Sequence, residues 1–390
     1  MTTRRSFIKT GVVAGVGTAL APFAAQAITT SVTGFGNTDS NDSDAKNSLD
    51  GNTGSVIKKQ ERKHWVWTNP DLSDTEATLQ KRYKSYYEHG IRGIFFEADS
   101  EKHYRMAKAH KLEAHRWMWT MNRGEISLLK AHPEWYAINR KGESCADKPP
   151  YVDYYRWLCP SREEVKQYLV DDVKAILSKD YVDGIHLDYV RFCDVILPVN
   201  LWENYHIEQI KELPEYDYCY CEVCKAKFEA WRGQSLDQIK FPDASLSWRL
   251  FRYHAITDIV NEIAKVASQN KKQITAAVFP TPEVARRNVR QDWTNWNLTG
   301  ICPMIYHGFY KESVPWIGDA VAEGVNWLHG KFPLYAGLYI SDFKDHLEVQ
   351  SGMEYALKNG AAGISLFGNV TDEILAALQK ASFNIKPDHV

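Results

Sequence analysis

The feature that most constrains this chain is an alternation of short apolar segments with amphipathic ones, starting at residue 64 and continuing almost to the C-terminus. Short apolar runs fit buried strands, and the segments between them have the 3.6-residue period of helices. Eight such units in about 320 residues predict a (β/α)8 TIM barrel, which belongs to the α/β class. The predicted strands cover residues 64–69, 93–98, 112–120, 184–192, 273–280, 300–306, 333–340 and 363–369.

The competing architecture is an open, doubly wound sheet. That fold usually carries a glycine-rich turn after its first strand, where backbone N–H groups bind a phosphate. In this chain the first predicted strand runs into Thr68, Asn69 and Pro70, with no glycine. The barrel is therefore favoured, with a long cysteine-containing insertion after the fourth strand, at about residues 193–245.

The first 27 residues resemble an export signal. Residues 3–9 (TRRSFIK) fit a twin-arginine motif, and residues 25–27 (AQA) fit a cleavage site of small residues. The stretch between them is mildly apolar, too short and too interrupted for a stable membrane span. We expect export by the twin-arginine machinery to the periplasm or the cell exterior; the alternative is a basic N-terminus that arose by chance.

Residues 28–60 are rich in Ser, Thr, Asn, Asp and Gly. Such a composition buries too little apolar area to offset the conformational entropy of folding, so this segment is predicted to be a disordered linker. The barrel domain is then predicted to span residues 61–385. Without residues 1–27 the chain has 44 basic and 49 acidic residues, a net charge of −5. This balance argues against nucleic acid or an anionic membrane surface as a partner.

Active sites of such barrels lie at the C-terminal ends of the strands, which directs attention to Asp188. Strand alternation places His186 and Asp188 on one face of the fourth strand. A charge at the end of a buried strand is costly unless it is paired or functional, and a structural ion pair with Arg191 is the alternative. Glycoside cleavage requires two carboxyl groups, and Asp188 is the predicted nucleophile or base.

The second carboxylate has two main candidates. Glu97 ends the second predicted strand, and Glu283 lies beyond the fifth. Aromatic surroundings would raise the pKa of either side chain and suit it to act as a general acid. The alternatives are a structural hydrogen-bonding role for Glu97 and a favourable helix-dipole position for Glu283. Asp99 and Asp342 are further options.

The chain has 13 Trp and 21 Tyr residues, enough for a thick core or for surfaces that stack on sugar rings. Aromatic residues near strand ends are the best candidates for such stacking, although a single Trp more often packs between barrel and helices. The predicted substrate-binding residues are Trp67, Trp119, His186, Arg191, Tyr306 and Tyr339.

Three of the seven cysteines, Cys219, Cys221 and Cys224, are closely spaced in the insertion. Their spacing fits a structural zinc site with Cys193 or His206 as the fourth ligand. A disulfide plus a free thiol fits equally well outside the cytoplasm, and no bond at all is the third option. No metal or other cofactor is expected for catalysis.

Five runs of residues occur in a fixed order: 132–135 (HPEW), 158–161 (LCPS), 183–191 (DGIHLDYVR), 291–296 (QDWTNW) and 303–306 (PMIY). Together they resemble the bacterial glycosyl-hydrolase-like family ten. The resemblance covers about residues 64–380 and implies a TIM barrel that acts on a polysaccharide; some members cleave peptide-free peptidoglycan strands. Asp188 matches the position of the family's strand-four acid, whereas Cys159 stands where the family often has a small polar residue.

Two aspartates within these runs have simpler explanations. Asp183 precedes the fourth strand, at the opposite end of the barrel from Asp188, and is expected in a turn or a cap. Asp292 is expected to cap a helix N-terminus, with Trp293 and Trp296 packing inward.

These observations give one hypothesis and two alternatives. The hypothesis is an exported glycoside hydrolase with paired carboxylates that cleaves a polysaccharide, with a cell-wall glycan as one candidate substrate. One alternative is a non-catalytic carbohydrate-binding barrel, in which the second carboxylate has no suitable position. The other is a metal-dependent hydrolase that removes acyl groups from sugars, with His186, Asp188 and His307 as its nearest set of ligands.

Overall fold

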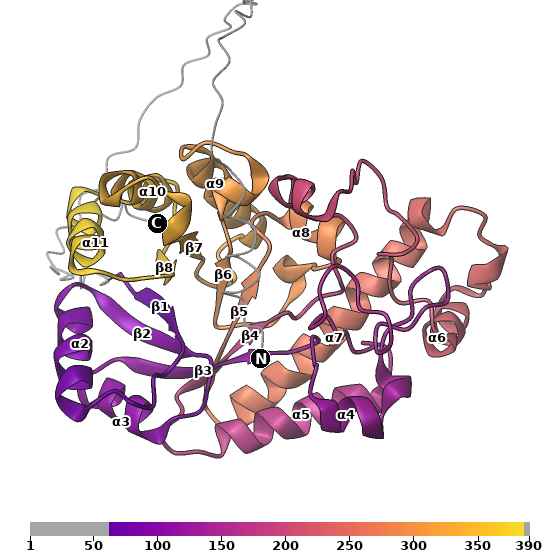
Figure 1. Cartoon of the computed structure of the whole chain (residues 1–390), viewed down its shortest axis with the longest axis horizontal. Helices are drawn as coiled ribbons and strands as arrows, with labels where there is room; N and C mark the ends of the chain where they lie inside the picture. The colour runs from indigo at the N-terminus through magenta and orange to yellow at the C-terminus, as the bar shows by residue number, and fades with distance from the viewer. Residues whose placement is uncertain (1–61, 386–390) are drawn as a thin grey trace, which may run out of the picture. The chain divides into compact units, whose positions relative to one another are not determined.

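The computed structural model describes residues 62–385 (Figure 1). The predicted signal peptide (1–27) and linker (28–60) lie outside the described residues. Eight parallel strands form one sheet in the order β6-β5-β4-β3-β2-β1-β8-β7. Parallel bridges between Ile301 and Leu334 and between Met304 and Gly337 join β6 to β7 and close the sheet. The predicted (β/α)8 barrel is therefore confirmed.

All eight predicted strands are present, with ends shifted by a few residues. The strands are β1 (His64–Thr68), β2 (Ile91–Phe96), β3 (Glu113–Trp119), β4 (Gly184–Asp188), β5 (Gln273–Val278), β6 (Gly300–Pro303), β7 (Tyr335–Tyr339) and β8 (Gly363–Phe367). The helices outside them are α2 (Glu76–Glu88), α3 (Glu101–Ala109), α4 (Ile126–Ala131), α5 (Glu163–Leu177), α6 (Glu222–Arg232), α7 (Leu246–Gln269), α8 (Pro282–Val289), α9 (Trp316–Leu328), α10 (His346–Lys358) and α11 (Asp372–Asn384).

Hydroxyl side chains mark the starts of several helices. Thr75 before α2, Ser245 before α7 and Thr281 before α8 each accept a hydrogen bond from a backbone N–H of the first turn. Such caps satisfy N–H groups that have no partner within the helix. At these three positions the capping residue fixes where the outer helix begins. Within residues 62–385, none of the helices combines the length and the apolar composition needed to cross a membrane.

The barrel interior is filled largely by aromatic rings. Trp65 stacks on Phe95 with ring centroids 4.5 Å apart, and Phe95 in turn stacks on His186 at 3.7 Å. Room for these rings comes from glycine: a Cβ atom at Gly93 would lie 2.2 Å from the Trp65 ring. The interior is thus a packed core, and chemistry is confined to its C-terminal end.

Two long excursions leave that C-terminal end. The predicted insertion follows β4 and contains α6 with four short 3-10 helices, η2 (Val199–Leu201), η3 (Glu203–Tyr205), η4 (Leu236–Gln238) and η5 (Pro242–Ala244). An excursion that the sequence analysis did not predict follows β3, spans residues 120–162, and contains α4 and η1 (Pro133–Trp135). The two are joined by an antiparallel bridge between Asn139 and Tyr218.

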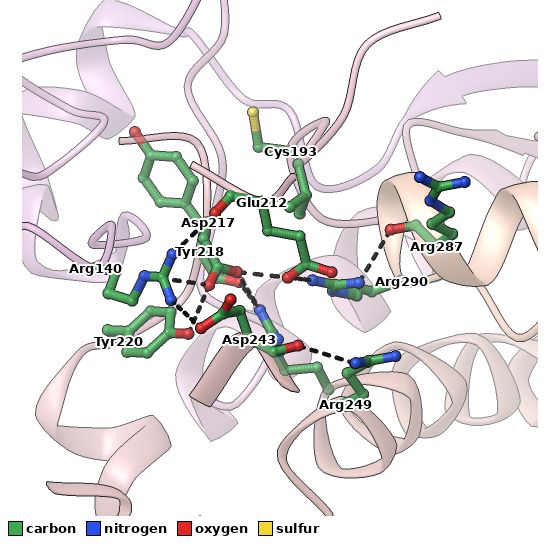
Figure 2. A network of polar contacts seen from close by, with 12 residues as sticks. Arg140, Cys193, Glu212, Asp217, Tyr218, Tyr220, Asp243, Arg249, Arg287 and Arg290 are labelled. Atoms are coloured by element: carbon green, nitrogen blue, oxygen red, sulfur yellow. Dashed lines mark hydrogen bonds and ion pairs between the residues drawn. The ribbon is translucent and has the colours of Figure 1, made fainter. Parts of the chain in front are cut away.

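A buried carboxylate anchors the insertion to the barrel's outer helices (Figure 2). Asp217 is fully buried and forms an ion pair with Arg252 of α7. Arg290, after α8, lies 3.8 Å from the Asp217 carboxylate. The Tyr220 hydroxyl donates a hydrogen bond to the same carboxylate at 2.6 Å. Arg140 of the other excursion lies 3.7 Å away. Side chains from four segments of the chain therefore meet at one charge.

Candidate functional site

Asp188 is the last residue of β4, at the C-terminal end of the barrel. One carboxylate oxygen accepts the backbone N–H of Tyr189 at 2.7 Å, and the other accepts the indole N–H of Trp117 at 3.1 Å. Tyr189 has a positive φ of 49°, which is uncommon for a residue with a side chain. Backbone strain next to an oriented carboxylate is typical of functional positions.

The interior layer below Asp188 contains His186, which forms hydrogen bonds through both ring nitrogens. The Trp67 indole N–H donates to His186 Nε2 at 2.9 Å, and the other ring nitrogen, Nδ1, lies 2.8 Å from the Thr275 hydroxyl. Trp67 and His186 are both buried. Direct substrate contact by Trp67 and His186 stays a prediction; in this structure they support the layer beneath Asp188.

The same hydrogen bonds bear on the metal-dependent alternative. Both ring nitrogens of His186 have protein partners, and the His307 ring packs against Phe343 with centroids 4.7 Å apart. His186, Asp188 and His307 do not form a metal-ligating group among residues 62–385. The deacylase alternative therefore lacks its metal site within the described residues.

One aromatic group lies over the ends of β3 and β4. Trp119, predicted as a sugar platform, is partly exposed and contacts Tyr154 and Tyr189 with ring centroids 5.9 and 4.8 Å apart. The Trp119 indole N–H is buried without a hydrogen-bond partner in the described structure. Sequence analysis missed Tyr154 and Tyr189; the tyrosine-rich run at residues 151–155 was the available signal.

A second aromatic group lies over the ends of β6, β7 and β8. Tyr306 and Tyr339 are 5.6 Å apart by ring centroids, and Phe367 is 6.2 Å from the first and 5.6 Å from the second. Phe367 also contacts Trp117, the residue that holds Asp188. The predicted ligands Tyr306 and Tyr339 therefore share the end of the barrel with Asp188.

Arg191 does not pair with Asp188. Its guanidinium forms a buried ion pair with Asp194 at 2.8 Å and lies over the rings of Trp157 and Tyr189. The structural ion pair considered as an alternative explanation for Asp188 is therefore wrong. Substrate binding by Arg191 stays a prediction; here it packs the start of the insertion against the aromatic group over β3 and β4.

The structure separates the two predicted partner glutamates. Glu97 follows β2 directly, is partly exposed, and belongs by alternation to the same inward-facing set as Gly93 and Phe95. Glu283 is exposed in the first turn of α8 and lines a pocket with residues of α7 and α9, including Arg249 and Trp327. None of the residues lining that pocket is on a strand and Asp188 is not among them, so a catalytic role of Glu283 stays a prediction.

Of the two further options, Asp342 has the more distinctive environment. Asp99 forms an exposed ion pair with Lys179. Asp342 ends η8 (Ile340–Asp342), just after β7, and accepts the backbone N–H of Gly308 at 3.2 Å. Burial raises the pKa of the Asp342 carboxyl from 3.8 to about 7. None of the ion pairs among residues 62–385 includes Asp342, so this carboxyl is suited to carry a proton near neutral pH.

The two other aspartates of the sequence motifs are structural. Asp183 accepts the Ala114 N–H at 3.0 Å and pairs with Lys108 at 2.6 Å, at the N-terminal end of the barrel as expected. Asp292 occupies the cap position of η6 (Trp293–Asn295), but its carboxylate is bound by the Arg286 and Asn295 side chains.

The cysteines differ from the prediction in one member. Four buried sulfur atoms, those of Cys159, Cys219, Cys221 and Cys224, lie within 4.8 Å of one another and could bind a metal. Cys193 and His206, the expected fourth ligands, are not in this group. Cys159 takes that place, and sequence analysis missed it because it lies 60 residues before the other three.

Comparison with known proteins agrees with this geometry. The family model described as Glycosyl hydrolase-like 10 matches residues 103–344, more than half of the chain. The match includes β3 to β7, Asp188, Asp342 and all four clustered cysteines. No curated protein matches the chain.

Several solved structures share the fold at low sequence identity. The glycoside hydrolase domain of PgaB (BpsB) from Bordetella bronchiseptica has a TM-score of 0.59 at 11% identity, covering 83% of this chain and 97% of that one. A beta-galactosidase from Marinomonas ef1 has a TM-score of 0.56 at 10% identity, over 82% and 59% of the two chains. The beta-amylase catalytic domain from Paenibacillus polymyxa has a TM-score of 0.54 at 11% identity, over 84% and 99%.

Proposed function

The chain belongs to the glycosyl hydrolase-like 10 family, and from this membership we propose that it is a glycoside hydrolase whose catalytic carboxylate is Asp188. Family and fold together support a carbohydrate-acting hydrolase. The single observation that carries the catalytic assignment is the oriented carboxylate of Asp188 at the end of β4. Its two oxygens each accept a neutral N–H group, from Tyr189 and Trp117, which fixes the carboxylate's direction.

We propose Asp342 as the proton donor. Glycoside cleavage needs an acid that protonates the departing oxygen and a carboxylate that attacks the sugar or activates water. A carboxyl group with a pKa near 7 is protonated often enough to serve as that acid at neutral pH. In the closed barrel β7 is separated from β4 by β5 and β6, so the two side chains approach the barrel end from different sides. Glu97 remains the alternative acid.

The two aromatic groups over the strand ends are proposed to bind the sugar rings. Trp119 and Tyr154 would contact the substrate over β3 and β4, and Tyr306 and Tyr339 would contact it over β6 and β7. Aromatic faces suit the apolar C–H faces of sugars, while phenol and indole groups supply hydrogen bonds. The unpartnered indole N–H of Trp119 is a donor suited to a sugar hydroxyl.

The substrate and the location are proposed from the sequence. The twin-arginine motif at residues 3–9 supports export to the periplasm or the cell exterior. An exported polysaccharide hydrolase meets bacterial cell-wall glycans there, and we propose these as the substrate class. The solved structures with this fold include a beta-galactosidase and a beta-amylase, which by their names act on different carbohydrates, so a panel of glycans is the appropriate test.

The test is the release of reducing ends from peptidoglycan strands and other bacterial polysaccharides by the purified protein. We expect Asp188→Asn to lower the rate about 10³-fold or more, since it removes the attacking or water-activating carboxylate. Asp183→Asn is the matched control, because Asp183 lies at the other end of the same strand, and its rate should stay near that of the wild type. Binding without release by the wild type would favour the carbohydrate-binding alternative; acyl release without new reducing ends would favour the deacylase.

A further inference from the structure

We propose that Cys159, Cys219, Cys221 and Cys224 bind one Zn²⁺ ion that fastens the excursion after β3 to the insertion after β4. The Cys159 sulfur is 3.5 Å from the sulfurs of both Cys221 and Cys224. All four sulfur atoms lie within 4.8 Å of one another, and all four side chains are buried. This inference is independent of the proposed hydrolase activity.

The sulfur spacing fits a tetrahedral zinc site. Zinc–thiolate bonds of about 2.3 Å in a tetrahedron place neighbouring sulfurs about 3.8 Å apart. A disulfide requires about 2.05 Å, well below the 3.5 Å found between Cys159 and its neighbours. An iron–sulfur cluster places several atoms between its cysteine ligands, which would spread them further than these sulfurs are. Four ligands without access for water describe a closed structural site, not a catalytic one.

The local structure supplies partners for thiolates. Cys221 occupies the N-cap position of α6 and Cys224 lies in the first turn of the same helix, where backbone N–H groups favour negative charge. The Ile138 N–H donates to the Cys219 sulfur at 3.3 Å. The Ser161 hydroxyl lies 3.2 Å from the Cys224 sulfur. These contacts form the hydrogen-bonded surroundings that metal-bound thiolates require.

The position of Cys159 gives the ion a structural task near Asp188. Two residues earlier, the Trp157 ring lies 5.7 Å from the Tyr189 ring and 4.7 Å from the Arg191 guanidinium. A metal bound to Cys159 would therefore hold the segment around Trp157. That segment packs against Tyr189, the residue that follows Asp188. On the other side, the ion would hold the start of α6 and the strand-like segment at Tyr218.

The experiment is a measurement of metal content by mass spectrometry on the full chain, purified without added metal. We expect about one zinc per chain in the wild type and at least a tenfold lower content in Cys159→Ser and Cys224→Ser. Cys302→Ser is the matched control, since Cys302 is also a buried cysteine but lies in β6, outside the group. It should retain the zinc of the wild type.

A second measurement keeps the test valid if the serine variants do not fold. Titration of the wild type with a mercurial reagent should release one zinc as the four clustered thiols react. Iron in place of zinc, a disulfide between any two of the four cysteines, or no stoichiometric metal would each overturn the proposal. None of these outcomes depends on whether the protein cleaves a glycan, so failure here and failure of the hydrolase proposal are separate results.

Discussion

Two partly or fully buried carboxylates, Asp217 in the insertion and Asp342 at the end of β7, have opposite environments. Burial alone would raise the pKa of Asp217, but the charges of Arg252 and Arg290 hold it below its ordinary value. Asp342 has only a backbone N–H from Gly308, and burial raises its pKa to about 7. The first is a charge neutralised by its surroundings, and the second is a carboxyl group whose affinity for a proton is raised.

The difference between Asp217 and Asp342 distinguishes a structural carboxylate from a candidate catalytic one. A buried charge with several partners holds segments together, because removing one partner leaves the others uncompensated. A buried carboxyl without a cationic partner contributes little to holding segments together, and such groups are concentrated at functional sites. By this criterion Asp217 is a structural attachment of the insertion, and Asp342 is a candidate for the chemistry proposed at the ends of β4 and β7.

The largest effect is expected from breaking the charge cluster of the insertion. Asp217→Ala leaves Arg252 buried without its carboxylate and leaves Arg290 paired with Glu212 alone, which should cost about 3–5 kcal/mol of local stability. Hydrogen exchange should show faster exchange at residues 193–245 while the barrel strands keep their protection. Asp243→Ala is the control, since Asp243 pairs with Arg140 at a more exposed site and should cost below about 1 kcal/mol. Unchanged protection in Asp217→Ala would contradict the structural assignment.

The pH dependence of stability should reveal the proton on Asp342. Because its pKa is raised on folding, the folded state keeps a proton that the unfolded chain releases, and this group's contribution falls as pH rises from about 4 to 7. The loss amounts to at most about 4 kcal/mol. Asp342→Asn should remove this dependence in urea unfolding across that range.

Asp345 is the opposite case and serves as the control for that experiment. It caps α10, and the N–H groups of Glu348 and Leu347 hold its pKa below the ordinary value. Its contribution is therefore present above about pH 4 and is lost as pH falls. A wild-type stability curve that Asp342→Asn leaves unchanged would remove Asp342 as the proposed acid.

A smaller effect is expected within the barrel core. Gly93→Ala places a methyl group against the Trp65 ring and should cost about 1–3 kcal/mol through overpacking. The melting temperature of the whole barrel should fall, in contrast to the local effect of Asp217→Ala. Gly124→Ala is the control, because its nearest neighbour would lie at 3.7 Å, an ordinary contact. Equal melting temperatures for the two variants would show that the interior tolerates the added methyl group.

The barrel was predictable because its strands repeat a local pattern. The apolar run before Asp188 predicts both the fourth strand and where it ends. The eight repeats give the fold, and the place of Asp188 at a strand end makes it the candidate carboxylate. The depth of a side chain inside the barrel was not predictable. Alternation places Trp67 on the inward face, but it does not show that Trp67 lies below the barrel end with a hydrogen bond to His186. For Glu283 the helix-dipole alternative describes its position, because Thr281 caps α8 and Glu283 lies in the first turn of that helix.

The insertion was the less predictable region. Its attachments join residues far apart in the chain, such as Cys159 with Cys221 and Arg140 with Asp217. Local periodicity and spacing carry no information about such contacts. Three of the four clustered cysteines were visible as a motif, but the fourth required the path of the chain after β3.

The most direct test of the central claim measures binding and turnover in the same variant. With the glycan that the wild type cleaves, Asp188→Asn should bind with a Kd within a few-fold of the wild-type value while kcat falls about 10³-fold or more. The aromatic contacts would remain, and only the reacting carboxylate would be lost. A variant that retains turnover, or loses binding and turnover together, would contradict the assignment of Asp188 as the catalytic carboxylate.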